Sequence, residues 1–193
     1  MMAKRTRKQE MRLQQANKER RRKQLLIGVP LFIVVAVLGF VIINRFLIPI
    51  EGIETFMGLS REHNVNAEFN TNGLPPAGGE HKPQWLNCGI YSEPVDTAYA
   101  VHSLEHGAIW ITHKPQIDPT ELQKIYDIGR DDSLILISPY EGQTYDIVVT
   151  AWQAQMVPDN ADDTRIPQFI ARYRGGGPEP GTNCSNGVGV PDA

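Results

Sequence analysis

A run of 19 residues without a charge, Leu25 to Ile43, places the strongest constraint on how this chain can fold. The run is rich in Val, Ile, Leu and Phe. At a rise of about 1.5 Å per residue, about 20 such residues span the hydrocarbon core of a bilayer. Pro30 lies within the first two turns of such a helix, where a missing backbone donor is tolerated best. The sequence therefore predicts a transmembrane helix over residues 25–43.

A cleaved signal peptide would show a shorter apolar run. Signal peptides carry roughly 7–15 apolar residues before a small-residue cleavage site. The segment that follows this run, Asn44-Arg45-Phe46-Leu47, offers no such site. No cysteine lies near the end of the run, which argues against cleavage at a lipid anchor. We therefore expect an uncleaved, single-pass anchor.

Charge is distributed unequally on the two sides of the apolar run. Residues 1–24 contain ten Lys and Arg against two Glu, whereas the residues after Ile43 contain the other nine of the 19 Lys and Arg and 20 of the 22 Asp and Glu. Because positive flanks stay inside, we expect a cytoplasmic tail over residues 1–24 and an extracytoplasmic part after about Asn44, at the cell membrane. An acidic domain is a poor partner for nucleic acid. The sequence identifies no protein partner.

The two cysteines, Cys88 and Cys184, lie on the side expected to be extracytoplasmic. An even cysteine count in an oxidising compartment favours a disulfide. The bond would close a loop of about 97 residues and, in the entropic account, would stabilise the fold by about 4–5 kcal/mol. In the alternative interpretation, Cys88 is a free thiolate ligand near the histidines.

The segment after the apolar run divides into a connector and one domain. Residues 44–64 are expected to form a juxtamembrane connector with room for one short helix, and residues 65–193 one compact α+β domain. Turn-forming residues fill positions 70–79, and the Gly- and Pro-rich tail 175–193 is expected to be irregular and held only through Cys184. Apolar patterns and capping residues predict strands at 108–112, 134–138 and 145–152 and helices at 118–128 and 165–173. This order predicts a small mixed or antiparallel sheet with helices on one face.

The heptapeptide Val101-His102-Ser103-Leu104-Glu105-His106-Gly107 contains two histidines four residues apart with a carboxylate between them. Residues i and i+4 share one face of a helix, so both imidazoles would approach a common point. The spacing also fits the H-x-x-E-H pattern, in which both histidines bind zinc and the glutamate is a general base. A peptidase needs a third ligand on a second helix and a substrate cleft, for which a domain of this size leaves little room. A metal-dependent hydrolase stays an alternative.

His81 follows a glycine turn, where a firmly held backbone lets the ring project. With His102 and His106 it would complete a three-imidazole site suited to zinc or copper. Glu105 would be a fourth ligand or would orient a ligating ring, and His63 is a further candidate ligand. The favoured hypothesis is a membrane-anchored extracytoplasmic domain that binds one transition metal through histidines.

Two other interpretations of the histidines stay open. In the first interpretation, the histidines are hydrogen-bonded polar groups of a small core. The domain is then a structural or accessory subunit of a membrane complex without a metal. In the other, individual histidines lie outside any site. His113, next to Lys114, is predicted to be such a surface or strand-end residue.

Three stretches of the chain together resemble one known family. They are Pro75-Pro76-x-Gly78-Gly79-x-His81-x-x-x-Trp85-x-x-Cys88-Gly89-x-Tyr91, Val101-His102-Ser103-Leu104-Glu105-His106-Gly107-Ala108 and Pro178-Glu179-Pro180-Gly181-x-x-Cys184. Over about His63 to Cys184 the chain resembles domain-of-unknown-function family 3105, a group of bacterial and some archaeal membrane-anchored or exported proteins. The resemblance implies an exported domain with recurrent histidines and two cysteines, and no particular activity. Family positions are occupied by His81, Cys88, His102, Glu105, His106 and Cys184, whereas His63 matches loosely and His113 stands where Tyr is more usual.

Overall fold

The computed structural model describes residues 7–43, 49–69, 73–181 and 183–193. The chain divides into two compact units, Met1–Ile48 and Pro49–Ala193. Parts of four predicted segments lie outside the described residues, namely residues 1–6 of the basic tail, residues 44–48 of the connector, residues 70–72 of the turn-rich segment and residue 182 of the Gly- and Pro-rich tail.

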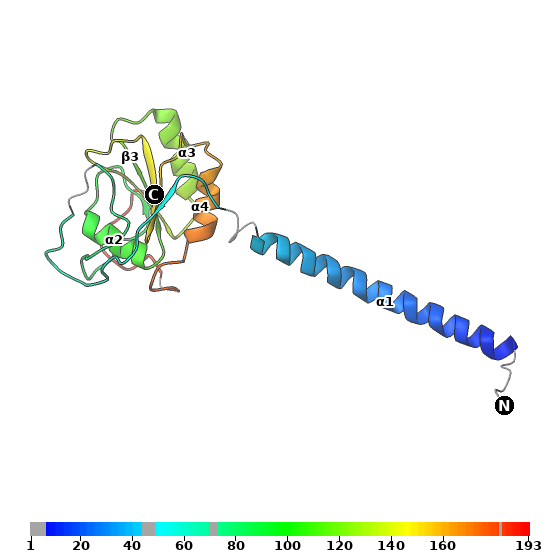
Figure 1. Ribbon diagram of the computed structural model, residues 1–193. Coiled ribbons are helices and arrows are strands. Elements are labelled where there is room, and N and C mark those ends of the chain that lie inside the picture. The colour runs from blue at the N-terminus through cyan, green and yellow to red at the C-terminus, as the bar shows by residue number, and fades with distance from the viewer. Residues whose placement is uncertain (1–6, 44–48, 70–72, 182) are drawn as a thin grey trace. The chain divides into compact units, whose positions relative to one another are not determined.

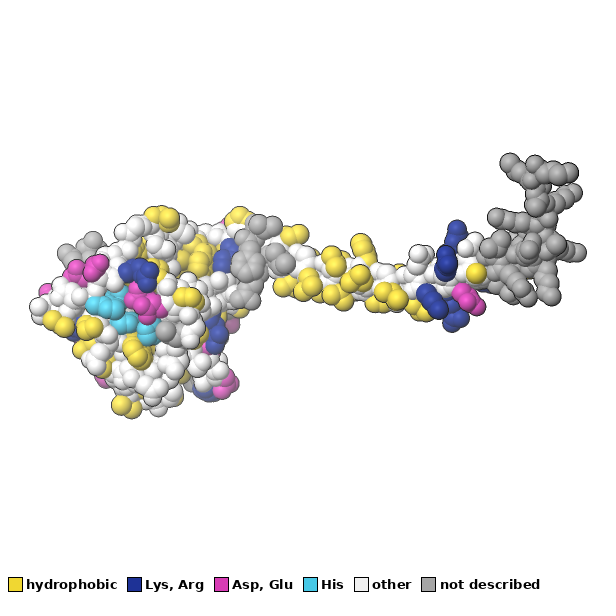
Figure 2. Space-filling view, turned by 90° about the horizontal axis from the view of Figure 1, so that it is seen from below, with side chains coloured by type: hydrophobic (Ala, Val, Ile, Leu, Met, Phe, Trp, Pro, Cys, Tyr) yellow, Lys and Arg dark blue, Asp and Glu magenta, His cyan; other side chains and the backbone are white. Residues whose placement is uncertain are grey.

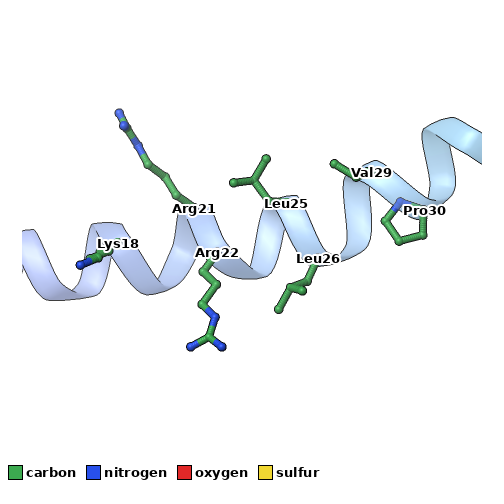
Figure 3. A pocket seen from close by; sticks show the side chains of 7 residues that line it. All are labelled: Lys18, Arg21, Arg22, Leu25, Leu26, Val29 and Pro30. Atoms are coloured by element: carbon green, nitrogen blue, oxygen red, sulfur yellow. The ribbon is translucent and has the colours of Figure 1, made fainter.

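The first unit is built from one helix, α1, Arg7–Ile42. Pro30 lies inside this helix without ending it. Figure 3 shows the stretch in which the side chains of Lys18, Arg21 and Arg22 are followed by those of Leu25, Leu26, Val29 and Pro30. Over Ala16–Val41, α1 is long and apolar enough to cross a membrane.

A six-stranded sheet forms the centre of the second unit, in the order β1-β6-β5-β3-β4-β2. The central strand β3 pairs in parallel with β4 and antiparallel with β5, so the sheet is mixed, which is one of the two predicted arrangements, and the α+β class is confirmed. All three of these strands were predicted from their apolar runs. The strands are β1 Ile53–Thr55, β2 Gly89–Ile90, β3 Ile109–His113, β4 Ile135–Pro139, β5 Ile147–Ala151 and β6 Ala154–Met156.

Helices cover both faces of this sheet (Figure 1). Helices α3 (Pro119–Gly129) and α4 (Arg165–Tyr173), both predicted, pack on one face through side chains such as Ile125 and Phe169. Helix α2 (Thr97–Glu105) packs on the other face. The expectation of helices on one face therefore holds for α3 and α4 only. Because strands β3, β4 and β5 are buried at every residue, the sheet needs a covering layer on each side.

Two segments that were expected to be peripheral form backbone hydrogen bonds with strands of the sheet. Strand β1, within the expected connector, pairs antiparallel with β6. The C-terminal tail lies along β2, where the Ile90 N–H donates to the Ala193 carbonyl (2.8 Å) and the Asp192 N–H donates to the Ile90 carbonyl (2.7 Å). The tail is therefore held at several points in addition to Cys184. Strands of two or three residues are too short to show the alternation that would have predicted them.

Cys88 and Cys184 are joined in a disulfide, with their Cα atoms 5.3 Å apart. The bond links residues 96 positions apart in the sequence. Next to it, the Cys88 N–H donates to the Cys184 carbonyl at 2.8 Å. Neither sulfur is a free thiolate, so Cys88 is not a metal ligand in this fold.

Candidate metal centre

Helix α2 has an apolar face and a polar face side by side. Val101 and Leu104 pack into the core on the sheet, and His102 and Glu105, each the next residue in the chain, are turned from them by about 100° and are also buried. Asp96 caps the start of the helix by accepting a hydrogen bond from the Ala98 N–H at 2.9 Å. The helix thus holds its histidine and its glutamate one turn apart on a rigid, buried element.

A glycine ends α2 immediately after these residues. The Ala108 N–H donates to the Ser103 carbonyl (3.0 Å) and the Gly107 N–H to the Leu104 carbonyl (2.9 Å), the hydrogen-bond pair of a Schellman motif. Gly107 has φ +89°, a left-handed conformation that favours glycine. His106 is the capping residue with helical φ and ψ, so its ring follows that of His102 by about one turn.

His63 and His81 lie in two loop segments on the same side of α2. The segments pair as a short parallel bridge, in which the Asn64 N–H donates to the His81 carbonyl (2.7 Å) and the His81 N–H to the Glu62 carbonyl (3.1 Å). The turn before His81 contains Gly79 at φ +118°. His63 and His81 therefore arrive as neighbours, although 18 positions separate them in the sequence.

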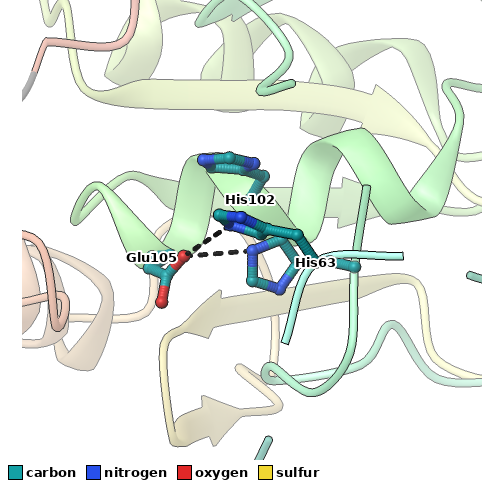
Figure 4. Close-up of side chains that lie close together, drawn as sticks. His63, His102 and Glu105 are labelled. Atoms are coloured by element: carbon teal, nitrogen blue, oxygen red, sulfur yellow. Dashed lines mark hydrogen bonds and ion pairs between the residues drawn. The ribbon is translucent and has the colours of Figure 1, made fainter. Parts of the chain in front are cut away.

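Four side chains form what we call the inner cluster: His63, His81, His102 and Glu105. Their candidate ligand atoms all lie within 4.8 Å of one another. The rings of His63 and His102 are stacked with centroids 4.8 Å apart, and the Glu105 carboxylate points toward the histidines (Figure 4). His81, His102 and Glu105 are buried, whereas the His63 side chain is 42% exposed. Figure 2 shows histidine side chains gathered on one face of the domain, beside acidic and basic groups.

Backbone carbonyls determine which ring nitrogens face the inner cluster. His81 Nδ1 donates to the Gly79 carbonyl and His102 Nδ1 to the Lys82 carbonyl, both at 2.7 Å. Because a carbonyl oxygen only accepts, each Nδ1 carries a proton and each Nε2 is left to face the cluster. Histidines that bind metals in proteins are oriented by the same kind of hydrogen bond.

A buried contact between His81 and Glu105 needs a cation or a proton. His81 Nε2 lies 3.0 Å from Glu105 Oε2, and His81 is fully buried. With its proton on Nδ1, a neutral His81 would place a lone pair against the carboxylate, and two buried acceptors in contact are unfavourable. The contact becomes favourable when a metal ion or a second proton lies between the two atoms.

Nearby charges oppose the effect of burial on Glu105. Burial raises the pKa of Glu105, but the hydrogen bond from Arg61 Nε to Oε1 (2.9 Å) and the neighbouring His81 outweigh it, so the pKa lies below its usual value. Burial is the main cause that lowers the pKa of His102, and the adjacent histidines add to it. At neutral pH the cluster thus combines a carboxylate with a neutral His102, the protonation states that metal binding requires.

A second group, which we call the outer cluster, consists of His102, His106 and Glu179. Their candidate ligand atoms also lie within 4.8 Å of one another. His106 Nε2 is 3.5 Å from Glu179 Oε2, and His106 Nδ1 donates to the Asn183 carbonyl at 3.1 Å. The cluster lines an open pocket of about 510 Å³, together with Trp85, whose ring centroid lies 4.7 Å from that of His106.

The glycine-rich start of the tail positions Glu179. The Gly175 N–H donates to the Gly107 carbonyl (2.8 Å), and the Glu179 N–H donates to the Glu105 carbonyl (3.0 Å). Between these bonds the chain passes so close to α2 that a Cβ on Gly177 would lie 2.1 Å from the Glu105 carbonyl oxygen. Only glycine fits there, so the tail segment docks on the end of the helix.

The structure brings most of the predicted ligands together, but not as one set. His81, His102, His63 and Glu105 are neighbours, whereas His106 shares a ligand group with His102 and Glu179. Sequence reasoning did not identify Glu179 as a ligand, although it lies in one of the stretches that carried the family resemblance. It also missed Arg61, for which no motif or spacing gave a signal.

His113 lies outside both clusters and ends strand β3, as expected. It is nevertheless buried and not a surface residue, like every other residue of β3. Its Nδ1 donates to the Lys114 carbonyl at 2.8 Å. Burial lowers the pKa of His113.

Comparison with known proteins gives one match. The model of a family described as "Protein of unknown function (DUF3105)" matches residues 63–186, a segment that includes every member of both clusters and both cysteines. No curated protein and no solved structure matches the chain. The match covers more than half of the sequence, and the chain therefore belongs to this family of unknown function.

Proposed function

We propose that this protein is a single-pass, membrane-anchored, extracytoplasmic domain that binds one divalent transition metal ion at the inner cluster. One observation carries the proposal: three histidines and a glutamate place their candidate ligand atoms within 4.8 Å of one another. The hydrogen bonds that turn Nε2 of His81 and of His102 toward the cluster support it.

The donor set favours zinc or copper(II). Imidazole and carboxylate ligands suit both ions, and the disulfide removes the thiolates that would favour copper(I). Ligand atoms bonded to one ion at about 2.0–2.1 Å lie at most about 4.2 Å apart. Candidate ligand atoms that already lie within 4.8 Å of one another need at most a small adjustment to reach this spacing. His63, the exposed member, is the side chain that can move most freely.

Metal binding agrees better with the geometry than metal-dependent hydrolysis. In the H-x-x-E-H mechanism the glutamate acts as general base toward a metal-bound water. Glu105 instead accepts a hydrogen bond from Arg61 on one oxygen and lies against His81 with the other. A carboxylate engaged on both oxygens is a ligand or an orienting group, so we assign no hydrolytic role to it.

The location rests on three features of the chain. Helix α1 is long and apolar enough to cross a membrane, the basic residues precede it, and the disulfide is typical of an oxidising compartment. We expect a reporter fused after Ala193 to be active only outside the cytoplasm. A fusion that is active only in the cytoplasm would contradict the orientation.

Metal analysis of the full-length, untagged chain in detergent tests the binding. After exposure to Zn²⁺ or Cu²⁺ and desalting, we expect about one equivalent of metal per chain. His81→Ala and His102→Ala should each remove most of it. His113→Ala is the matched control, because it deletes an equally buried histidine outside both clusters and should keep the metal. Wild-type protein with far less than one equivalent of either metal would refute the proposal and favour the metal-free interpretation.

A further inference from the structure

We propose that the outer cluster is an access position, at which a divalent metal ion from solvent binds before it passes to the inner cluster. This inference rests on the proposed metal binding at the inner cluster. It assigns a role to His106 and Glu179, which the inner cluster does not use.

The two clusters share one ligand, which makes them alternative positions for one ion. His102 Nδ1 donates its proton to the Lys82 carbonyl, so Nε2 is the only ring nitrogen left to bind a metal. The centroid of the His102 ring lies 4.8 Å from the ring centroids of His63, His81 and His106. One lone pair binds one ion, so His102 serves either cluster but not both at once.

Exposure orders the two positions. In the outer cluster, the Glu179 side chain is 40% exposed and lies at the open pocket of about 510 Å³. All three members of the outer cluster line this pocket, whereas of the inner cluster only His63 and His102 do, and His81 and Glu105 are buried. An ion that enters from solvent through the pocket therefore meets the complete outer ligand set before it meets His81 and Glu105.

The donor sets favour movement inward. The outer cluster offers two imidazoles and one carboxylate, whereas the inner cluster offers three imidazoles and one carboxylate. The inner cluster also contains the contact between His81 Nε2 and Glu105 Oε2 that a cation makes favourable. A weaker, exposed position next to a stronger, buried one allows His102 to keep hold of the ion while its other ligands are exchanged.

Rapid mixing of the full-length chain with Cu²⁺ alone tests the access role. Copper quenches tryptophan fluorescence, and Trp85 lies beside His106 while Trp152 lies beside His81 at 5.8 Å between ring centroids. Glu179→Gln removes the exposed carboxylate with little change of shape. We expect it to slow both association and dissociation roughly tenfold, because an intermediate on the route affects both directions equally. The copper bound at equilibrium should stay at one equivalent.

Two further variants sharpen the experiment. Glu141→Gln removes the same charge at an exposed turn and should leave both rates unchanged, which separates a local role from net charge. His106→Ala should slow both rates as Glu179→Gln does, again without loss of bound copper.

The inference would be overturned by any of three results: unchanged rates in Glu179→Gln, loss of equilibrium copper in that variant, or two copper ions per wild-type chain. The second result would make Glu179 a ligand of the resident ion, and the third would make the clusters independent sites. Wild-type protein that binds no metal would instead refute the proposed function itself, and the inference with it.

Discussion

Metal binding at the inner cluster should stabilise the domain by a measurable amount. The ligands come from positions 63, 81, 102 and 105, so the site exists only in the folded chain. A ligand that binds only the folded state at 100 times its Kd stabilises it by about 2.7 kcal/mol. In a unit the size of Pro49–Ala193, each kcal/mol raises Tm by about 2–4 °C. Saturating Zn²⁺ should therefore raise Tm by about 5–11 °C.

The assay compares thermal melts of the full-length chain in detergent, followed by near-ultraviolet circular dichroism, with EDTA or with Zn²⁺ at 100 times the measured Kd. His81→Ala should lose the metal-dependent rise. It should also melt at a lower temperature in EDTA, because it deletes a fully buried ring that packs on Trp152. His113→Ala should lower Tm in EDTA but keep the rise with Zn²⁺.

This comparison separates lost binding from lost stability, since both variants remove a buried histidine. A wild-type Tm that is the same in EDTA and in saturating Zn²⁺ or Cu²⁺ would refute the reasoning. So would a rise in His81→Ala as large as that of the wild type, because the cluster would then not contain the ligand.

Three further predictions concern stability. Reduction of Cys88–Cys184, which closes a loop of 96 positions, should lower the free energy of unfolding by about 4 kcal/mol in urea titrations, and a loss below about 1 kcal/mol would contradict this. Gly177→Ala should lower the free energy of unfolding by about 1–3 kcal/mol, because the new Cβ would overlap the Glu105 carbonyl oxygen. A variant as stable as the wild type would show that the tail does not dock there. The third prediction concerns pH in the metal-free protein. His102 binds a proton near its usual pKa of 6.5 in the unfolded chain, whereas burial lowers this pKa in the folded chain. The free energy of unfolding should therefore fall as the pH is lowered through 6.5. It should fall again below about 4.5, where Glu105 is protonated in the unfolded chain before it is protonated in the fold. Urea titrations from pH 7.5 to 4 that show rising stability would be incompatible with these shifts.

Elements with a strong local pattern were predictable from the sequence. The apolar run from Leu25 is matched by helix α1, the Asp118-Pro119 pair marks the start of α3, and Ile135–Pro139 is a central strand as its apolar run suggested. In each case neighbours in the chain supply the signal, because helix capping and apolar periodicity act over a few residues. The pair of His102 on α2 and His106 at its cap was recognisable for the same reason.

The composition of the candidate site depended on contacts between distant segments. His63 reaches His81 through a backbone bridge, Arg61 reaches Glu105 across 44 positions, and Glu179 is placed by the docking of a glycine-rich tail on the end of α2. None of these contacts follows from residue spacing, since a ligand group is defined by distances in space. The rings of His81, His102 and His106 are likewise oriented by backbone carbonyls from other segments. The sequence alone determined which residues could bind a metal, and tertiary packing decided which of them meet.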